Sequence, residues 1–408
     1  MNLTERWRAQ AYAHSDFLFV FALFVSFRLM MLMLFSPVNF LTLGYTDFMY
    51  YYEMASLSSQ GHFPFIDFWF EYPPVFTYLV IGVYQLTRHM DSFDYFARTL
   101  SLVMLPFESL VLINLYRIAR RLYGGATAVR LAWIYAMLLL PVFFWQYSFD
   151  SMVAALVLQS LYWLMTDQRA ASGITLALAI ATKFSPAFLI GTAWRFAANV
   201  REAARYTFIV AAGVALIFLP FVLISPAFTI ASFQSLMAVS SWETIWALMD
   251  GNKSNGDVGP LPRHFDLTMA GVPTGNPSLL PMWATLIPFA LISLFVFTRR
   301  VDRNNPRHML IFTGITLTLF HLWSKGWSPQ WVTLVLPFLL LFYPNGRGVL
   351  FSLVFSFVTL LDWPLSFVLG VPLIFVVSIL IRTALFVLIG IDLYLELVRA
   401  PTPRAANL

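Results

Sequence analysis

The chain has 408 residues, of which 60% are hydrophobic, 17% aromatic and only 11% charged. Because a soluble protein carries about 25% charged residues, and the mean hydropathy here is +0.75, the composition excludes a soluble globular fold. It predicts an all-α, polytopic integral membrane protein. The formal net charge of +5 then reports on membrane topology and not on nucleic-acid binding, and the absence of Cys excludes disulfides, thiolate nucleophiles and Cys-ligated zinc.

Apolar stretches long enough to cross a bilayer follow one another along the chain. A helical crossing needs about 20 apolar residues, and we expect a single domain (residues 1–408) with about 10–12 such helices. Ten crossings are expected near residues 16–36, 99–117, 128–145, 149–166, 206–225, 279–298, 308–323, 330–343, 348–366 and 371–394.

Basic side chains distinguish the two sides of the membrane. With these crossings, many Arg residues fall on one side: Arg6, Arg8, Arg117, Arg120, Arg121, Arg130, Arg169, Arg195, Arg201, Arg205, Arg299, Arg300, Arg303, Arg307, Arg347, Arg399 and Arg404. Since Lys and Arg are held back in the cytoplasm, this side is predicted to be cytoplasmic. The pattern therefore predicts a multi-pass protein of the cell membrane with both termini inside.

The first outer loop, residues 37–98, is acidic and aromatic. Between residues 37 and 87 it holds four carboxylates and no Lys or Arg. The apolar stretch 74–87 cannot be a full crossing, because Arg117 would then be forced outside. We expect it to form a juxtamembrane helix on, or dipping into, the outer leaflet. Carboxylates at a membrane surface, among aromatic residues and Pro turns, suggest chemistry on a substrate that is itself lipid-bound.

A second apolar stretch, residues 172–194, also fails as a simple crossing. It lies between Arg169 and Arg195, which must share a side of the membrane. About twenty residues cannot cross twice, so we expect two half-helices broken at residues 183–186, with Lys183 at a buried hairpin tip. Broken backbone at membrane depth is tolerated only where it lies within protein or lines a polar cavity.

Asp47 is the candidate catalytic residue. Thr46 is expected to cap a helix that begins at Asp47 and ends by Gly61, and on this helix Tyr50 and Tyr51 lie beside the carboxylate. The functional interpretation is a general base that takes a proton from a sugar hydroxyl. The structural alternative is an acidic residue in the first turn, where it favours the helix dipole. The residues alone leave both open.

Asp67 and Glu71 are spaced i, i+4 before a Pro-Pro turn. They could hydrogen-bond substrate hydroxyls, hold a divalent cation with Asp47, or cap the helix that follows Pro73. For Glu71, substrate binding and capping stay open, while Asp67 is interpreted as a solvated or positioning residue. We expect no metal cofactor, because nearby acids are few and cations are placed to do the same electrostatic work.

Charged side chains inside a membrane are costly and mark functional sites by default. Lys183 and Lys325 are both predicted near the outer side, where two cations suit a lipid phosphate whose negative charge grows as it leaves. The structural alternatives are an ion pair for Lys183 and snorkelling to the interface for Lys325. Arg28 is interpreted as a phosphate ligand and Arg382 as a snorkelling residue.

The second outer loop, residues 226–278, is longer than ordinary connections, which is typical of a lid or binding loop. Its Trp242 and Glu243 could stack on and hydrogen-bond a sugar, although interfacial Trp is also common. Asp150 opens a crossing at the outer side, either as a substrate contact or as a carboxylate at a helix N-terminus. His321 has no metal-ligand spacing.

These segments resemble the GT-C superfamily of glycosyltransferases. They are most similar to polyprenyl-phosphate-mannose-dependent mannosyltransferases and to the catalytic subunit of GPI mannosyltransferase I. The segments that carry the resemblance are Tyr45-Thr46-Asp47, Gly61 with Pro64-Phe65-Ile66-Asp67, Glu71-Tyr72-Pro73-Pro74, Ala181–Pro186, Trp242-Glu243-Thr244, and Lys325–Trp331 followed by Leu336-Pro337. The resemblance covers most of the chain in order; no single motif is highly specific.

The resemblance implies an enzyme that transfers a sugar, expected to be mannose, from a polyprenyl-phosphate donor to a hydroxyl of a lipid or glycan acceptor. Transfer would proceed with inversion and without a nucleotide, at an active site facing outside. Asp47 would be the general base, and Glu71, Lys183, Lys325 and Gln330 would line the donor and acceptor cavity. The absence of a phosphate-cradling Gly-rich loop also argues against a nucleotide site.

Two alternatives come from other functional classes. A transporter or flippase of lipid-linked saccharides would also use broken helices and buried charges. The acid-rich loop occurs once, however, and no paired halves are visible in the sequence. A non-catalytic subunit that binds lipid would not need carboxylates concentrated in one outer loop.

Overall fold

The computed structural model describes residues 14–35, 47–253, 256 and 258–399. Within these ranges the chain is helical and forms no strand beyond isolated bridges, which confirms the predicted all-α fold. The expected cap Thr46, and the basic residues Arg6, Arg8 and Arg404, lie outside the described residues.

The helices follow the chain in this order: α2 (Ser15–Leu34), α3 (Asp47–Ser56), η1 (Leu57–Gln60), α4 (Pro74–Thr87), η2 (Arg88–Met90), α5 (Phe93–Tyr123), α6 (Gly125–Met137), α7 (Leu139–Phe144), α8 (Asp150–Met165), α9 (Arg169–Ile180), η3 (Ser185–Phe188), α10 (Leu189–Arg195), α11 (Val200–Ile224), α12 (Pro226–Ala238), α13 (Ile245–Asp250), η4 (Leu261–Phe265), η5 (Leu267–Gly271), α14 (Met282–Phe297), α15 (Pro306–Trp323), η6 (Pro329–Trp331), α16 (Val332–Phe342), α17 (Gly346–Leu360), η7 (Leu361–Leu365), α18 (Ser366–Leu369) and α19 (Pro372–Val398).

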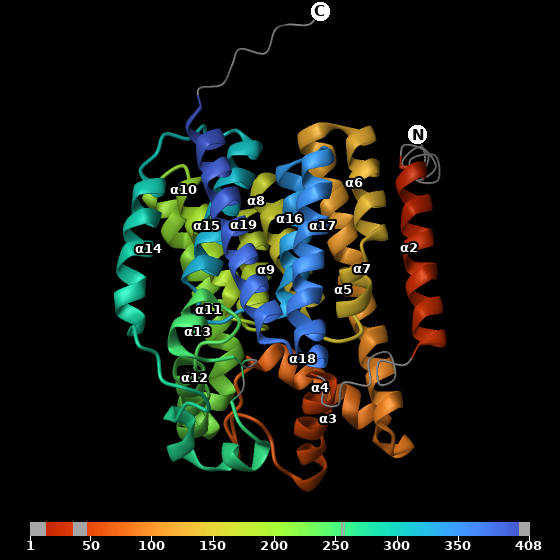
Figure 1. Cartoon of the computed structure of the whole chain (residues 1–408), viewed down its shortest axis with the longest axis vertical. Coiled ribbons are helices and arrows are strands. Elements are labelled where there is room, and N and C mark those ends of the chain that lie inside the picture. Colours follow the sequence, from red (N-terminus) through yellow and green to blue (C-terminus); the bar gives the residue numbers. More distant parts are fainter. Residues whose placement is uncertain (1–13, 36–46, 254–255, 257, 400–408) are drawn as a thin grey trace, which may run out of the picture.

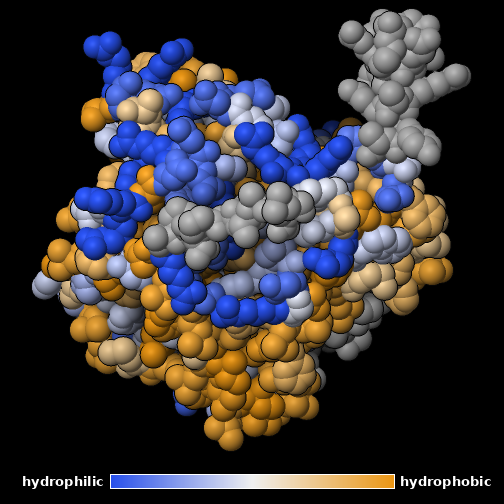
Figure 2. Space-filling view, turned by 90° about the horizontal axis from the view of Figure 1, so that it is seen from above, coloured by the Kyte–Doolittle hydropathy of each residue, from blue (hydrophilic) through white to orange (hydrophobic). Residues whose placement is uncertain are grey.

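The helix ends define two faces of the bundle. At one face, called the arginine face below, α5 ends, α6 and α9 begin, and α19 ends (Figure 1). Figure 2 looks onto this face and shows hydrophilic side chains over the helix ends, with hydrophobic side chains around the periphery. The opposite face, called the loop face, carries α3, α4, α12 and α13 (Figure 1). The predicted segregation of Arg residues to one side is therefore present in the fold.

Apolar helices form the body of the molecule. Those long and apolar enough to cross a membrane are Ser15–Leu34, Phe93–Tyr123, Val200–Ile224, Gly346–Leu365 and Pro372–Val398, and shorter apolar helices lie between them. Their exposed Leu, Ile and Phe side chains face outward, as lipid contact requires. The prediction of a multi-pass membrane protein is confirmed.

The crossing predicted near residues 128–145 is broken. The expected helix over residues 128–145 is two helices, α6 and α7, separated at Leu138, whose ψ of 132° is extended. Pro141 explains the break, because a proline ring clashes with the carbonyl four residues earlier, here that of Met137. The sequence contained this signal, and the prediction of one continuous helix was wrong.

The predicted hairpin over residues 172–194 is confirmed. α9 ends at Ile180 and the chain turns through η3 into α10. The Arg169 guanidinium at the start of α9 donates to the Phe196 carbonyl just after α10, with a distance of 2.9 Å. The two ends therefore lie together at the arginine face, and the turn around Lys183 lies inside the bundle.

The two long loops pack against each other at the loop face. The rings of Trp69 and His264 stack with centroids 3.8 Å apart. The Trp69 amide donates to the His264 carbonyl (3.1 Å), and the Phe70 amide donates to the Ser232 hydroxyl (2.9 Å). These contacts hold the segment before Glu71 in one position under the bundle.

Two arginines in the helices form buried ion pairs. Arg28 contacts Glu108 at 2.7 Å with neither side chain exposed, and Arg382 is paired with Asp362. Breaking such a pair by removing one partner costs about 3–5 kcal/mol, because a charge is left buried alone. The interpretation of Arg382 as a snorkelling residue was therefore wrong: its charge is neutralised inside the protein. The partner of Arg28 favours a structural role over phosphate binding.

Candidate active site

Asp47 is the first residue of α3, and its half-buried carboxylate faces the interior. Its Oδ2 accepts a hydrogen bond from Nε2 of Gln330, 3.0 Å away, on η6. Burial, followed by the Asp150 carboxylate, raises the pKa of Asp47 to about 7, against the opposing effects of Lys183 and the Tyr51 hydroxyl. A carboxyl group with a pKa near neutrality is suited to general-base catalysis, since it is both ionised often enough and basic enough.

Lys183 and Asp150 form the charged centre next to Asp47. Lys183 Nζ lies 2.7 Å from Asp150 Oδ1, and the side chains are only 13% and 5% exposed. The ammonium also lies 4.8 Å from the ring centroid of Trp331. The ion-pair alternative for Lys183 is thus realised in the structure. It does not exclude a substrate role, because Lys183 has further N–H donors and Asp150 Oδ2 has no partner within the described part of the chain.

Two tyrosine rings lie beside the acids. Tyr51 and Tyr72 contact each other edge to face, with centroids 5.8 Å apart. Burial, then the Asp47, Glu71 and Asp150 carboxylates, raises the pKa of the Tyr72 hydroxyl well above its usual range, so all three acids lie near it. The face of α3 predicted to carry Asp47 and Tyr51 therefore meets the Glu71 segment and the start of α8.

Glu71 and Asp67 are placed differently. Glu71 is buried and its Oε2 accepts a hydrogen bond of 3.0 Å from the Tyr50 hydroxyl, so these two candidate substrate-binding residues meet at the edge of the site. Asp67 Oδ2 accepts from the Phe63 amide at 2.8 Å and closes the turn between these residues. This contact supports the positioning interpretation of Asp67.

Trp242 joins the second loop to the segment after α15. Its amide donates to the Lys325 carbonyl, and its own carbonyl accepts from the Trp327 amide, both at 3.1 Å. A Cβ on Gly326 would come within 2.2 Å of the Trp242 ring, and one on Gly256 within 2.6 Å. Only glycine allows this close approach of backbone and ring. Trp242 therefore fixes the position of the residues that follow Lys325.

Glu243 is buried behind Trp242, with 1% of its surface exposed. Its backbone has a φ of +49°, and its carbonyl accepts a hydrogen bond from the Arg382 guanidinium. Burial, then the Asp362 carboxylate, raises the pKa of Glu243 well above its usual range. Its Oε2 has no hydrogen-bond partner among the described residues, which leaves it available to a ligand.

Lys325 points elsewhere. Its Nζ donates to the Leu280 carbonyl at 2.7 Å, in the segment that leads into α14. The contacts that the structure gives its ammonium do not include Asp47 or Lys183. The expectation that Lys325 joins Lys183 on a departing phosphate stays a prediction.

The sequence reasoning missed His321 and Trp331 as site residues. His321 is 7% exposed, and within the described part of the chain neither ring nitrogen has a partner. The Trp331 ring lies 5.8 Å from the His321 ring and thus connects His321 to Lys183. A buried ionisable residue near the end of an apolar helix is a signal that could have identified His321.

Unpartnered buried polar atoms are rare in folded proteins and call for a ligand, water or ion. Among the described residues, several gather around this centre: Asp150 Oδ2, Glu243 Oε2, both His321 nitrogens and Trp327 Nε1. Donors and acceptors are both present, as in a site for sugar hydroxyls. Within the described ranges no three His, Asp or Glu side chains are grouped as a metal ion requires, and the prediction that no metal takes part is left for experiment.

Comparison with known proteins gives one matching sequence family and several similar folds. Residues 69–324 match the sequence model of Glycosyltransferase family 87. The fold is similar to the archaeal oligosaccharyltransferase AglB from Archaeoglobus fulgidus in complex with an inhibitory peptide and a dolichol-phosphate (TM-score 0.48, 13% identity, 97% of this chain and 57% of AglB). It is also similar to ArnT from Cupriavidus metallidurans bound to undecaprenyl phosphate (TM-score 0.51, 15% identity, 91% of this chain and 76% of ArnT). The chain thus spans little more than half of AglB, and no curated protein matches the sequence.

Proposed function

The chain belongs to glycosyltransferase family 87 and has a fold of the GT-C type, and we propose that it transfers a mannosyl residue from a polyprenyl phosphate to the hydroxyl of a lipid or glycan acceptor. The membership favours an enzyme over a transporter or a lipid-binding subunit. The choice of mannose comes from the resemblance of the motifs, and the lipid-linked donor is supported by the undecaprenyl phosphate in the ArnT complex.

In the proposed reaction Asp47 accepts the proton of the acceptor hydroxyl. The acceptor oxygen forms a bond to the anomeric carbon while the bond between that carbon and the phosphate oxygen breaks. The electron pair of the broken bond stays on the phosphate oxygen. Attack opposite the departing phosphate inverts the anomeric centre. Lys183 stabilises the negative charge that grows on the phosphate. The proton ends on Asp47, and the lipid phosphate is released.

One observation carries this proposal. A carboxylate with a pKa near 7 and a lysine ammonium lie in one centre, surrounded by buried polar atoms that have no partner in the described part of the chain. Asp47 comes from the first loop, Lys183 from the broken hairpin and Gln330 from η6, so three parts of the chain converge there. Tyr50, Tyr51, Glu71, Trp242, Glu243, Lys325 and Gln330 are proposed to contact the substrates.

The orientation in the membrane is also part of the proposal. Arg residues lie at the helix ends of the arginine face, among them Arg120 and Arg121 at the end of α5 and Arg169 at the start of α9, and by the positive-inside rule this face would lie in the cytoplasm. Asp47 opens α3 on the loop face, so the active site would open outside (Figure 1). A lipid-linked donor would then reach it in the outer leaflet.

The experiment is transfer from polyprenyl-phosphate mannose to a membrane lipid extract, with the product identified by mass spectrometry. Asp47→Asn should lower turnover about 10²–10⁴-fold, the usual contribution of general-base catalysis. Glu53→Gln, an exposed residue on the same helix, is the matched control and should leave turnover unchanged. Near-normal transfer by Asp47→Asn would remove Asp47 from this role, and transfer of another sugar would correct the donor.

A further inference from the structure

Several arginines lie together at the arginine face, where the end of α10 meets the connection between α14 and α15 (Figure 1). This arginine cluster consists of Arg195, Arg299, Arg300 and Arg303. Residues 195–199 and 298–305 contain the whole cluster, and Asp302 is the one acid among them. Positive charge is therefore concentrated where two connections of the chain come together.

Backbone carbonyls hold the arginine cluster in place. The Arg195 guanidinium donates to the Arg299 carbonyl, and Nη1 of Arg303 donates to the Ala198 carbonyl at 3.1 Å. These two bonds join the connections in both directions. A carbonyl orients a guanidinium but brings no net negative charge. Within the described ranges no member of the cluster forms an ion pair.

Other arginines on the same face do have counter-charges. Arg307 contacts Glu396 at 2.7 Å, and Arg169 contacts Glu202 at 2.6 Å. Asp302, the acid within the cluster, accepts a backbone amide through its Oδ1 instead of a guanidinium. The lack of a counter-charge at the cluster is therefore not shared by every arginine of this face.

Arg195 and Arg303 lie close to each other. Burial, followed by the Arg303 guanidinium, lowers the pKa of Arg195, which is half-buried. The Nε of Arg195 is buried and has no partner within the described part of the chain. The hydrogen bonds given above engage one nitrogen of each side chain, whereas a guanidinium has five N–H donors. Two such planar, charged groups side by side are suited to bind a phosphate.

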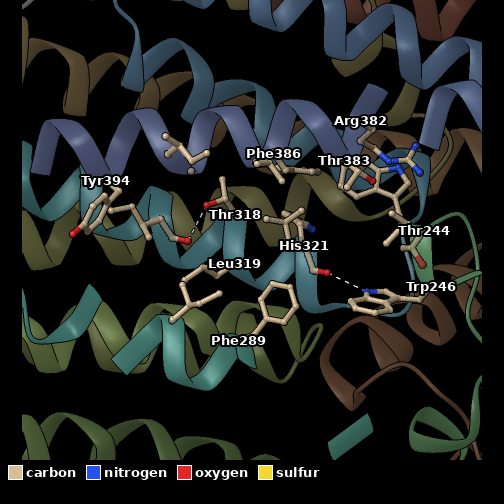
Figure 3. A pocket seen from close by; sticks show the side chains of 18 of the residues that line it. Thr244, Trp246, Phe289, Thr318, Leu319, His321, Arg382, Thr383, Phe386 and Tyr394 are labelled. Carbon is tan, nitrogen blue, oxygen red and sulfur yellow. Dashed lines mark hydrogen bonds between the residues drawn. The ribbon is translucent and has the colours of Figure 1, made fainter. Parts of the chain in front are cut away.

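The surroundings of the cluster place it at the depth of lipid head groups. Trp194 is 40% exposed directly before Arg195, and Trp is enriched at the membrane–water interface. The Arg299 guanidinium lies over the exposed Phe295 ring, 4.1 Å from its centroid. Phe295 and Tyr394 line the end of the apolar groove between α14, α15 and α19 that is nearest this face (Figure 3). Apolar surface therefore begins directly beneath the cluster.

We propose that the arginine cluster binds the phosphate of an anionic phospholipid in the leaflet at the arginine face, with Arg195 and Arg303 sharing the phosphate. The lipid supplies the counter-charge that the described residues lack, as anionic head groups do in basic pockets between membrane helices. The exposed Trp194 and Phe295 favour a lipid over a soluble phosphate ester, because an acyl chain covers them. Since Arg195 ends the hairpin that carries Lys183, the bound lipid also holds the base of this hairpin.

Native mass spectrometry of the whole, delipidated protein tests this site without sugar transfer. The probes are dioleoylphosphatidylglycerol and dioleoylphosphatidylcholine, which share the phosphate and the acyl chains and differ in net charge. We expect several-fold tighter binding of phosphatidylglycerol, because a choline group would return positive charge to the cluster. Equal binding of the two lipids would overturn the proposal.

Thermal unfolding in detergent distinguishes a lipid from a soluble phosphate. A ligand that binds the folded state raises Tm, so phosphatidylglycerol should raise the Tm of the wild-type protein by several degrees. Millimolar glycerol 1-phosphate, which has the phosphate without acyl chains, should change it little. An equal rise with glycerol 1-phosphate would overturn the lipid assignment and make this a site for soluble phosphate esters.

Variants locate the site. Arg303→Met and Arg195→Met should each weaken phosphatidylglycerol binding about fivefold, the usual contribution of one basic residue near an anionic lipid surface. Arg130→Met is the matched control, because Arg130 is exposed like Arg303 and also donates to a backbone carbonyl, but on α6 at the other side of this face (Figure 1). Arg303 is exposed, so its variant should fold even if Arg195→Met does not. Unchanged binding in Arg303→Met, or an equal loss in Arg130→Met, would contradict the proposal.

Discussion

Two segments of this chain look alike in sequence and differ in what they contribute to the site. Lys183-Phe184-Ser185-Pro186 and Lys325-Gly326-Trp327-Ser328-Pro329 both follow an apolar helix and both lead into a short 3-10 turn. In the first segment the lysine side chain is 13% exposed and contacts Asp150. In the second the lysine contacts the Leu280 carbonyl, and it is Gln330, just beyond the segment, that contacts Asp47.

The difference has a physical cause. The first segment turns inside the bundle, where an ammonium needs a buried counter-charge and finds Asp150. The second segment is held by its backbone to Trp242, and the Lys325 carbonyl accepts from both the Trp242 amide and the Thr244 hydroxyl. A Lys-Ser-Pro pattern therefore predicts a break in a helix, but the partners of the broken segment decide which side chain enters the site.

Replacing the two lysines tests this comparison most strongly. Lys183→Met should lower turnover by about 10²–10³-fold, the typical loss when one group that stabilises transition-state charge is removed. It should also destabilise the protein by about 3–5 kcal/mol, because Asp150 would be buried without its partner. Transfer assays and thermal unfolding in detergent measure the two effects.

A double variant separates the two roles of Lys183. Lys183→Met combined with Asp150→Asn removes the unpaired charge and should recover most of the thermal stability. If Lys183 acts on the phosphate, transfer stays low in the double variant. Recovery of transfer together with stability would make Lys183 a purely structural partner of Asp150.

Much of the architecture could be predicted because it follows from local rules. The apolar stretches gave the crossings, and the side on which Arg169 and Arg195 must lie gave the hairpin around Lys183. The pairs Arg28 with Glu108 and Arg382 with Asp362 could not be predicted, because each joins side chains on different helices, and which faces of those helices meet is decided only by the fold.

The site shows the same limit. Asp47, Lys183 and Gln330 were expected together from motifs; in the structure Gln330 donates to Asp47, while Lys183 contacts Asp150 and lies close enough to lower the pKa of Asp47. His321 was not predicted as a site residue, because no second potential metal ligand lies near it in the sequence. Its position depends on the packing of α15 against α19, which spacing along the chain does not reveal.

Gly326→Ala tests whether Trp242 holds the second segment. The added Cβ would come within 2.2 Å of the Trp242 ring, so ring or backbone must move. We expect a loss of about 1–3 kcal/mol in the free energy of unfolding, typical of overpacking, together with reduced transfer. Gly82→Ala is the control: it meets no atom within 4 Å on an exposed helix position and should stabilise the protein by about 0.5–1 kcal/mol. Wild-type stability in Gly326→Ala would show that the two segments are not held by this contact.

Gln330→Leu tests whether the residue that directly follows the second segment acts on the proposed base, Asp47. The amide of Gln330 donates to ionised Asp47, so its removal should raise the pKa of Asp47 further above about 7. Because the base must be ionised, turnover of the wild-type protein should rise with pH through about 7, and this rise should move to higher pH in Gln330→Leu. Gln85→Leu, whose amide donates to Ser58 instead, should leave the profile in place. An unmoved profile in Gln330→Leu would separate Gln330 from the protonation of Asp47.

Lys325→Met is expected to give the smallest effect. The ammonium is exposed and contacts a backbone carbonyl, so its influence on an anionic donor would act through solvent and be screened by salt. Exposed charges contribute about 0.2–1 kcal/mol, which corresponds to a rise of a few-fold in the donor KM at low salt, with kcat retained. The measurement is the donor KM at two salt concentrations. A loss of kcat as large as that of Lys183→Met, unchanged by salt, would place Lys325 on the departing phosphate and erase the difference between the two segments.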